Sequence, residues 1–350
     1  MNNQNAEAWD VIVIGSGPAG SAAAAICRKA GLNVLIVTQA AKPDASATIF
    51  PGSLESIHPG VSSLLEKIGA EGAEQLASLA TYDGIYAGDT YTPLGEDVNG
   101  TWQGLHIHRQ LFNTQLLLMI GASGVTIRCN QTIENFILEQ DRIVGIKTGS
   151  GELIYATHLI DASGKKAIAG KKLNLKRKFF SPPLLCWTGI SGGISSYPVD
   201  PHAAHFISGQ EEWTWLAPNP PDQCAWTRLS MRGEKSLLPP DLLKQYPIVG
   251  EVQAHNMRWR MYHPVCREGI ILCGDAAGIL DPAAGQGILN ALWSGIMAAN
   301  TVVSCLQNPA YEAFHLARYN HWFEEQFELK VSQLRAYYIT HGLSGLTAKM

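Results

Sequence analysis

The sequence predicts an α/β fold with an inserted β-rich region, and three observations carry this prediction. A short apolar run, 9–15, leads through a glycine-rich turn into an alanine-rich helical run, 21–30. A second strand–turn–helix pattern comes late, where the apolar run 269–273 precedes another glycine-rich turn and the helical run 288–303. Between them, the segment 179–263 has the alternating, aromatic-rich pattern of β-strands. With 350 residues the chain is long enough to bury a large core.

The composition argues against several classes of protein. The formal net charge of -4 argues against nucleic-acid binding. None of the seven cysteines forms a Cys-x-x-Cys pair, so we expect reduced, mostly buried thiols and no metal site. The N-terminus has no signal-peptide core, and no uninterrupted apolar stretch reaches the length of a membrane span. We therefore expect a cytoplasmic protein without a transmembrane segment.

The first turn carries the spacing of a dinucleotide-binding motif. Gly15, Gly17 and Gly20 form a G-x-G-x-x-G pattern between a strand and a helix. In this pattern the first glycine turns the chain, the second lets a pyrophosphate approach, and the third lets the helix pack on the strand. A second strand, 33–37, follows the helix. The start of the chain therefore predicts a Rossmann-like βαβ unit.

One position departs from this pattern. An acidic residue is expected at the end of the second strand, where it binds the adenosine ribose, but Thr38 stands there and is followed by Gln39. A neutral hydroxyl in place of a carboxylate weakens binding by about 1–3 kcal/mol. Alternatively, Gln39 or a neighbouring backbone group substitutes at little cost.

The late motif spans 274–288 and reads GDAAGILDPAAGQGI. A strand that enters a glycine-rich turn and then a helix presents free N–H groups and the positive end of the helix dipole to a ligand. Asp275 stands at the carboxyl end of the strand, where α/β sheets bind ligands. The pattern predicts a second ligand-contacting turn.

The late motif resembles the flavin-contacting motif of the FAD-dependent aromatic-hydroxylase (p-hydroxybenzoate hydroxylase-like) superfamily. That superfamily includes aromatic monooxygenases, flavin halogenases, geranylgeranyl reductases and quinone-cofactor maturation flavoproteins. The resemblance implies that Asp275 holds the ribityl chain of FAD and that Pro282, Gly285 and Gly287 lie beside the flavin ring. It also implies a Rossmann-like FAD-binding domain made of 1–178 and 264–350, the latter with C-terminal helices, and an inserted β-sheet substrate domain at 179–263.

Further motifs extend the resemblance. The superfamily places an arginine near the FAD pyrophosphate at the start of a helix, and Arg109 matches it. The segment 159–164 resembles an Asp-Gly-type motif that touches FAD and, in the hydroxylases, NADPH. The basic run after it, 165–178, either attracts a phosphorylated cofactor or is a solvated loop. Trp213 and Trp215 belong to a segment that resembles the Trp-x-Trp-x-Ile-Pro motif of flavin halogenases, although packing in a sheet explains most of the tryptophans equally.

The resemblance implies an FAD-dependent monooxygenase that hydroxylates an electron-rich aromatic. The substrate is a small molecule or a tryptophan in a partner protein during quinone-cofactor maturation, with NAD(P)H or a separate flavin reductase as electron donor. Halogenases carry a lysine after the amphipathic helix predicted at 59–69, and the corresponding stretch, 80–85, has none. A geranylgeranyl reductase-like ene-reductase, a halogenase and a non-enzymatic maturation protein remain alternatives. No catalytic acid or base is identified, and we expect His106 and His108 to be packing or surface residues.

Overall fold

The computed structural model describes residues 9–43, 54–98, 100–231 and 239–343. Its largest sheet has eight strands and joins segments from both ends of the chain. A parallel core is ordered β10-β2-β1-β13-β22, and β1 and β2 are buried almost throughout. The carboxyl ends of these strands meet at one edge, which sets the place of a ligand site. The bounds are β1 (Trp9–Ile14), β2 (Val34–Val37), β10 (Thr126–Arg128), β13 (Leu153–Asp161) and β22 (Ile270–Leu272).

An antiparallel extension completes this sheet. The first half of β13 pairs with β12 (Arg142–Thr148), and β12 pairs in turn with β11 (Ile133–Glu139). The second half of β13 pairs instead with β1 and β22, and β21 (Cys266–Arg267) pairs with β22. One long strand thus belongs to both the parallel core and the meander. The mixed α/β fold with a parallel sheet confirms the predicted fold class.

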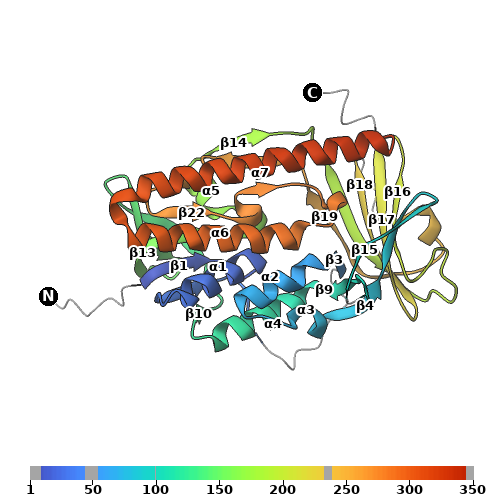
Figure 1. The fold of residues 1–350 in the computed structure, drawn as a ribbon, viewed down its shortest axis with the longest axis horizontal. Coiled ribbons are helices and arrows are strands. Elements are labelled where there is room, and N and C mark those ends of the chain that lie inside the picture. The colour runs from blue at the N-terminus through green and yellow to red at the C-terminus, as the bar shows by residue number, and fades with distance from the viewer. Residues whose placement is uncertain (1–8, 44–53, 99, 232–238, 344–350) are drawn as a thin grey trace.

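Helices cover the parallel core (Figure 1). The first helix, α1 (Pro18–Lys29), packs against α6 (Gly287–Gln307), and a Cβ atom on Gly295 of α6 would lie only 2.2 Å from the carbonyl oxygen of Ala19. The long α7 (Glu312–Thr340) runs along α6 and reaches the second sheet. The remaining helices are α2 (Gly60–Ile68), α3 (Ala73–Leu76), α4 (Arg109–Ala122) and α5 (Ile168–Lys172).

Helix α6 is long and apolar enough to cross a membrane by length and composition, with a hydropathy of 1.3 over its best window. The sequence predicted no membrane span, because no uninterrupted apolar stretch reaches the required length. In the structure half of this window is buried, and α6 packs against α1, α2 and α7. A buried core helix accounts for its apolar composition.

The second large sheet has seven strands, ordered β19-β15-β18-β17-β16-β5-β6. Five of these strands lie within 179–263, but β5 and β6 come from the segment before residue 100, where β5 pairs in parallel with β16. The predicted domain boundaries therefore remain a prediction, and the sheet itself crosses them. The bounds are β5 (Gly84–Ala87), β6 (Thr90–Pro93), β15 (Leu185–Ser191), β16 (Ala204–Ser208), β17 (Glu212–Asn219), β18 (Gln223–Ser230) and β19 (Ile248–Asn256).

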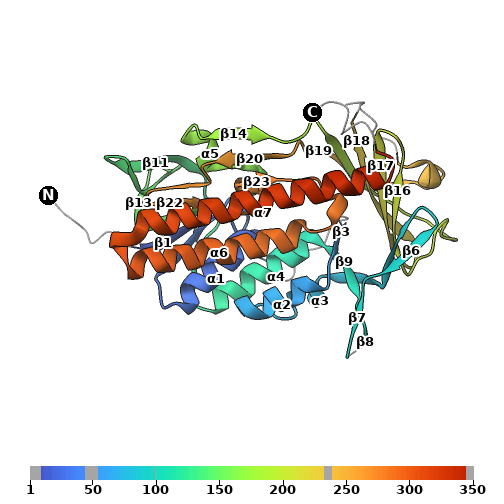
Figure 2. The ribbon, with the colours of Figure 1, turned by 45° about the horizontal axis from the view of Figure 1, so that its top comes forward.

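Three small sheets accompany the two large ones in the described residues. One joins β3 (Leu54–Ile57), β9 (Gly104–His108) and β4 (Ser78–Tyr82). Another joins β14 (Lys176–Phe179), β20 (Arg260–His263) and β23 (Gly278–Ile279). The third is a hairpin of β7 (Glu96–Asp97) and β8 (Gly100–Thr101), which projects from the body in Figure 2.

Candidate functional site

The first glycine-rich turn contains two closely packed glycines and one that faces open space. A Cβ atom on Gly15 would lie 2.5 Å from the carbonyl oxygen of Ala162, and one on Gly20 would lie 2.0 Å from the carbonyl oxygen of Gly15. These two glycines let β1, β13 and α1 pack closely. A Cβ atom on Gly17 would meet nothing within 4 Å. Gly17 is also the N-cap of α1 and supplies no side-chain cap, so open space lies beside the free N–H groups of the helix start.

Thr38 lies directly beside this turn. Its hydroxyl is 2.9 Å from the hydroxyl of Ser16 and accepts a hydrogen bond of 3.2 Å from the backbone N–H of Ala40. The side chain is buried, with 6% of its surface exposed. Gln39, the alternative ribose ligand, has its side-chain oxygen hydrogen-bonded to Lys166. The structure thus gives both candidate ribose ligands protein partners that the sequence did not reveal.

Asp275 lies in a 3-10 turn, Gly274–Ala276, directly after β22. Among the described residues, none donates a hydrogen bond to its carboxylate. Burial raises the pKa of Asp275, and the positive charges of Lys165 and Arg109 oppose that rise. A half-buried carboxylate without a donor is a position that a hydroxyl-bearing ligand would complete, and the predicted ribityl contact fits it.

The turn of Pro282, Gly285 and Gly287 is exposed and open. A Cβ atom on Gly285 or Gly287 would meet nothing within 4 Å, and Gly285 has a φ of +60°, which favours glycine. Gly287 is the first residue of α6, and the N-cap residue Gln286 makes no side-chain cap. The start of a 21-residue helix thus presents uncapped N–H groups beside open space, where a flavin ring would fit.

Asp281, which the sequence analysis did not single out, stabilises this turn through hydrogen bonds. Its carboxylate accepts hydrogen bonds from the N–H of Ala283 at 3.0 Å and from Nε1 of Trp259 at 2.6 Å. The hydroxyl of Tyr338 is also hydrogen-bonded to Asp281 and accepts a bond of 2.7 Å from Nε1 of Trp213. Burial raises the pKa of Asp281 despite these three donors. We call Trp213, Tyr338, Asp281 and Trp259 the Asp281 network.

The two tryptophans of the Trp-x-Trp segment therefore connect the second sheet to other elements. Trp213 reaches α7 through Tyr338, and Nε1 of Trp215 donates a bond of 3.0 Å to the hydroxyl of Ser56 on β3. That hydroxyl is also 2.9 Å from Nδ1 of His106. His106 is buried and stacks on Tyr82, so it is a packing residue, as the sequence predicted. His108 is the N-cap of α4, and the described residues contain no cluster that could hold a metal ion.

Arg109 is the first residue of α4 and lies beside β3. Its Nη1 is 2.5 Å from a carboxylate oxygen of Glu55, and its Nε donates a bond of 3.2 Å to Asn113. The sequence did not reveal Glu55 as a partner of Arg109, since 54 residues separate the two. The positive charge of Arg109 also opposes the rise in the pKa of Asp275. Contact with the FAD pyrophosphate remains a prediction.

The Asp-Gly-type motif ends β13 with a buried carboxylate. Asp161 accepts hydrogen bonds from the N–H of Ser163 at 2.9 Å and of Ala169 at 2.6 Å. This carboxylate shapes the backbone turn, and its side chain has no exposed surface for a ligand.

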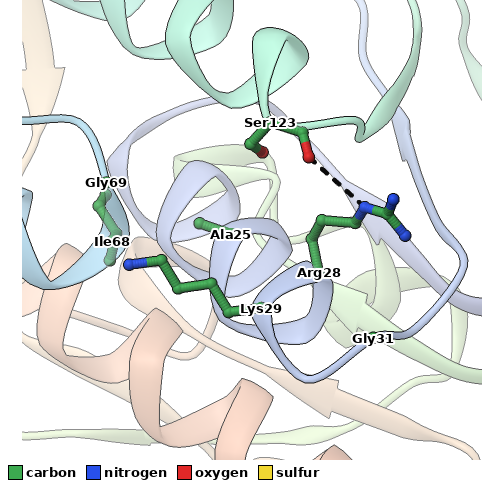
Figure 3. A pocket seen from close by; sticks show the side chains of 7 residues that line it. All are labelled: Ala25, Arg28, Lys29, Gly31, Ile68, Gly69 and Ser123. Carbon is green, nitrogen blue, oxygen red and sulfur yellow. Dashed lines mark hydrogen bonds between the residues drawn. The ribbon is translucent and has the colours of Figure 1, made fainter.

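Another cleft lies away from these turns. It has a volume of about 360 Å³ and forms where α1, α2 and α4 end (Figure 3). Arg28 and Lys29 donate hydrogen bonds there to the carbonyl oxygens of Ser123 and Lys67. These basic groups satisfy helix C-terminal carbonyls, which is a structural role. The cleft is therefore not a candidate site.

The cysteines do not contribute to the site chemistry. All seven are free, and six of them are buried, as the sequence predicted. Burial, and then the negative charge of Asp281, raises the pKa of Cys186 to about 12. Such a thiol stays protonated at neutral pH and is a poor nucleophile.

The parallel sheet, the open glycine turns and the donor-free carboxylate fit an FAD-binding flavoprotein. The family model described as "Glucose inhibited division protein A" matches residues 10–180. The chain is also 25% identical over 342 residues to the digeranylgeranylglycerophospholipid reductase of Methanocella arvoryzae, covering 89% of this chain and 82% of the relative.

Solved structures share the fold. The flavin-dependent brominase Bmp2 superposes with a TM-score of 0.80 at 21% identity, covering 97% of this chain and 89% of that chain. The peptidyl tryptophan dihydroxylase QhpG, described as essential for tryptophylquinone cofactor biogenesis, superposes with a TM-score of 0.73 at 20% identity, covering 96% and 77%. These comparisons confirm the predicted superfamily resemblance and FAD as the cofactor, and they make the chain an FAD-dependent oxidoreductase.

Proposed function

We propose that this flavoenzyme is a monooxygenase that hydroxylates an electron-rich aromatic group. The observation that carries the proposal is a buried apolar region between the second sheet and β3. Ile190, Ala217 and Ala225 form a buried cluster there, and Leu54 and Trp215 pack against it. When bound and reduced, FAD supplies electrons to O₂ and delivers oxygen to electron-rich carbon. The chain has to hold the aromatic group against the flavin and keep water out, and apolar side chains suit both tasks.

The stretch that carries a lysine in halogenases supports oxygenation over halogenation. Tyr82 is buried and donates a hydrogen bond of 3.2 Å to the carbonyl oxygen of Ile57, while Asp83 accepts one of 3.0 Å from Tyr91. No lysine occurs in 80–85 to capture a hypohalous acid. The side chains at these positions instead serve packing and turn geometry.

A protein-bound aromatic is included in the proposed substrate class. QhpG acts, by its description, on a peptidyl tryptophan, and its fold covers 96% of this chain. A tryptophan or another aromatic residue in a partner protein, or an indole or phenol of low mass, satisfies the chemical requirement for an electron-rich ring. Reducing equivalents come from NAD(P)H or a separate flavin reductase.

Ene-reduction of a prenyl chain is the second candidate. The observation that favours it is the 25% identity to an archaeal digeranylgeranylglycerophospholipid reductase across 89% of this chain. The two chemistries differ in what happens to the substrate, because one adds an oxygen atom and the other saturates a double bond.

Purified FAD-loaded protein, reduced and then exposed to O₂, tests the proposal with indole, a phenol and a tryptophan peptide in the presence of bromide. We expect a product that has gained one oxygen atom by mass spectrometry. A brominated product would contradict the proposal, and so would saturation of a geranylgeranyl substrate without oxygenation of any aromatic. The Asp275→Ala variant, which we expect to lose FAD, is the control that should give no product.

A further inference from the structure

In the basic run 165–178, some side chains form hydrogen bonds or ion pairs within the protein and others do not. Lys166 is hydrogen-bonded to Gln39, Lys172 donates a bond of 2.5 Å to the carbonyl oxygen of Glu134, and Lys178 forms an ion pair with Glu324. These three lysines have structural partners. The sequence alone left this run as either a phosphate-attracting segment or a solvated loop, and the structure separates the two groups.

Three of the remaining basic residues converge on one cavity. Lys165, Lys171 and Arg177 line it together with Arg260 from β20, and Asp275 lies on its wall. The cavity has a volume of about 100 Å³. We call it the cationic pocket. Its other lining residues are Ala167, Tyr262, Ala277, Gly278 and Ile279.

The sheet β14-β20-β23 orients the two arginines. In the β14–β20 pairing, Arg177 stands opposite Tyr262 and Phe179 stands opposite Arg260. Directly opposed residues of antiparallel strands share a face, and so do residues two apart, so the side chains of Arg177 and Arg260 lie on the same face. The guanidinium of Arg177 is 5.9 Å from the centre of the Tyr262 ring. This aromatic contact orients the N–H donors of Arg177 without neutralising its positive charge.

The four cations have no ionic partner in the described part of the chain. None of Lys165, Lys171, Arg177 and Arg260 forms an ion pair with a described carboxylate. Arg260 donates a bond of 2.9 Å to the carbonyl oxygen of Arg258, which orients it, and the single carboxylate of Asp275 on the pocket wall offsets only part of the positive charge of the four cations. Burial, and then the neighbouring charge of Arg177, lowers the pKa of Arg260. Gathering like charges is unfavourable, and an anion in the pocket would relieve it.

We propose that the cationic pocket binds the phosphate group of a phosphate ester other than FAD. Two arginine forks and two lysines suit phosphate oxygens, because arginine donates bidentate hydrogen bonds and lysine adds a compact charge. Asp275 on the wall places the bound phosphate next to the flavin site. The phosphate belongs to a nucleotide or to the head group of a glycerol-based lipid, since both present the same ester chemistry. The inference concerns binding alone and holds whether the flavin transfers oxygen or hydride.

Isothermal titration of the FAD-loaded protein at low salt tests the site. The probes are inorganic phosphate, 2′,5′-ADP for the nucleotide source, and glycerol 1-phosphate for the lipid source. We expect saturable binding of one ester, competed by inorganic phosphate, and the tighter ester identifies the source. Arg177→Gln and Lys171→Gln should each weaken it about tenfold. Both side chains are exposed, so the variants should fold, and circular dichroism verifies this.

Lys176→Gln is the matched control. It removes one positive charge from the same strand, one residue from Arg177 and on the opposite face, and Lys176 does not line the pocket. We expect it to weaken binding less than about twofold. Equal weakening by Lys176→Gln and Arg177→Gln would show diffuse surface attraction and overturn the proposal. So would an absence of binding by both esters, or binding to the apoprotein that FAD abolishes, because the pocket would then be part of the FAD site.

Discussion

The hydroxyl of Thr38 lies 2.9 Å from the hydroxyl of Ser16, so the residue at the acidic position of the dinucleotide fold is tied to the glycine-rich turn itself. Thr38 also accepts a bond from the N–H of Ala40. Its oxygen therefore already has protein partners before any ribose arrives. A carboxylate at this position would have two oxygens and a full charge, and one oxygen would be available to the ribose hydroxyls.

Thr38→Glu should tighten FAD binding by about tenfold or more, because a charge-assisted hydrogen bond contributes roughly 1.5–3 kcal/mol. Isothermal titration of the apoprotein with FAD measures the change. The control is Thr38→Val, which keeps the volume, removes the hydroxyl and should not tighten binding. If the glutamate variant folds and binds FAD no better than the natural protein, another group already grips the ribose.

Asp275→Ala should sharply reduce FAD occupancy while the chain still folds. The carboxylate has no donor among the described residues, so the apoprotein loses no hydrogen bond when it is removed. Bound FAD would lose a bond to a charged group, which contributes roughly 1.5–3 kcal/mol. Flavin absorbance per chain and circular dichroism measure the two effects. Full flavin content in a folded variant would refute the ribityl assignment.

The same carboxylate predicts a pH dependence of the apoprotein. Burial raises the pKa of Asp275 above its ordinary value of 3.8, so its protonated form is favoured on folding. The stability that Asp275 contributes is present below pH 3.8 and is lost as the pH rises through the higher folded value. The Asp275→Asn apoprotein should therefore have the higher Tm at pH 7, and the difference should vanish near pH 4. A constant difference across this range would contradict the predicted rise of the pKa.

The contribution of Glu312 to stability should have the opposite pH dependence to that of Asp275. Hydrogen bonds to His158 and Arg142 lower the pKa of Glu312 from 4.5 to about 2, against the effect of burial. Its stability is therefore present above pH 4.5 and is lost as the pH falls toward 2. Glu312 starts α7 and docks it on β12 and β13. Glu312→Gln should lower the Tm at pH 7 by at least about 2 °C, with the difference shrinking in acid.

A matched control separates this effect from the loss of any surface charge. Glu134 pairs with Lys147, and about half of its side-chain surface is exposed, at 51%. Glu134→Gln should change the Tm by less than about 1 °C, because exposed ion pairs contribute little. Equal shifts in the two variants would contradict the special role of Glu312.

Local patterns predicted the elements of this fold, and long-range partners escaped them. The amphipathic spacing of Val61, Leu64, Leu65 and Ile68 predicted α2, and all four are buried in it. Glycine spacing predicted both turns because each needs close packing or open space within a few residues. The pairing of β5 with β16 was not predicted, because the two strands are more than 100 residues apart in the sequence.

The candidate site shows the same division. The late motif was recognisable because its turn, carboxylate and helix start are contiguous in sequence. Glu55 as the partner of Arg109 was missed because 54 residues separate them. Asp281 carried one local signal, its place directly before Pro282, where an acidic residue caps a turn. Its donors Trp259 and Tyr338 come from β-rich and helical segments that sequence spacing does not bring together.

The Asp281 network leads to a last prediction. Tyr338 is fully buried, and its hydroxyl accepts from Trp213 at 2.7 Å and is hydrogen-bonded to Asp281. Tyr338→Phe leaves a buried N–H without its acceptor and a buried carboxylate with one donor fewer. We expect a loss of about 1–3 kcal/mol of stability and, because Asp281 caps the Pro282 turn, weaker FAD binding as well. Thermal unfolding and FAD titration measure the two effects.

The neighbouring tyrosine provides the control for this prediction. Tyr337 is half-buried, and its hydroxyl makes no hydrogen bond with a described residue, although its ring packs on Phe206 and His341. Tyr337→Phe keeps those ring contacts, so stability and FAD affinity should both stay close to those of the natural protein. If Tyr338→Phe lowers the Tm but leaves FAD affinity unchanged, the network stabilises the contact between α7 and the second sheet without positioning the flavin turn. A fall in both quantities in Tyr338→Phe alone would assign the network to the site.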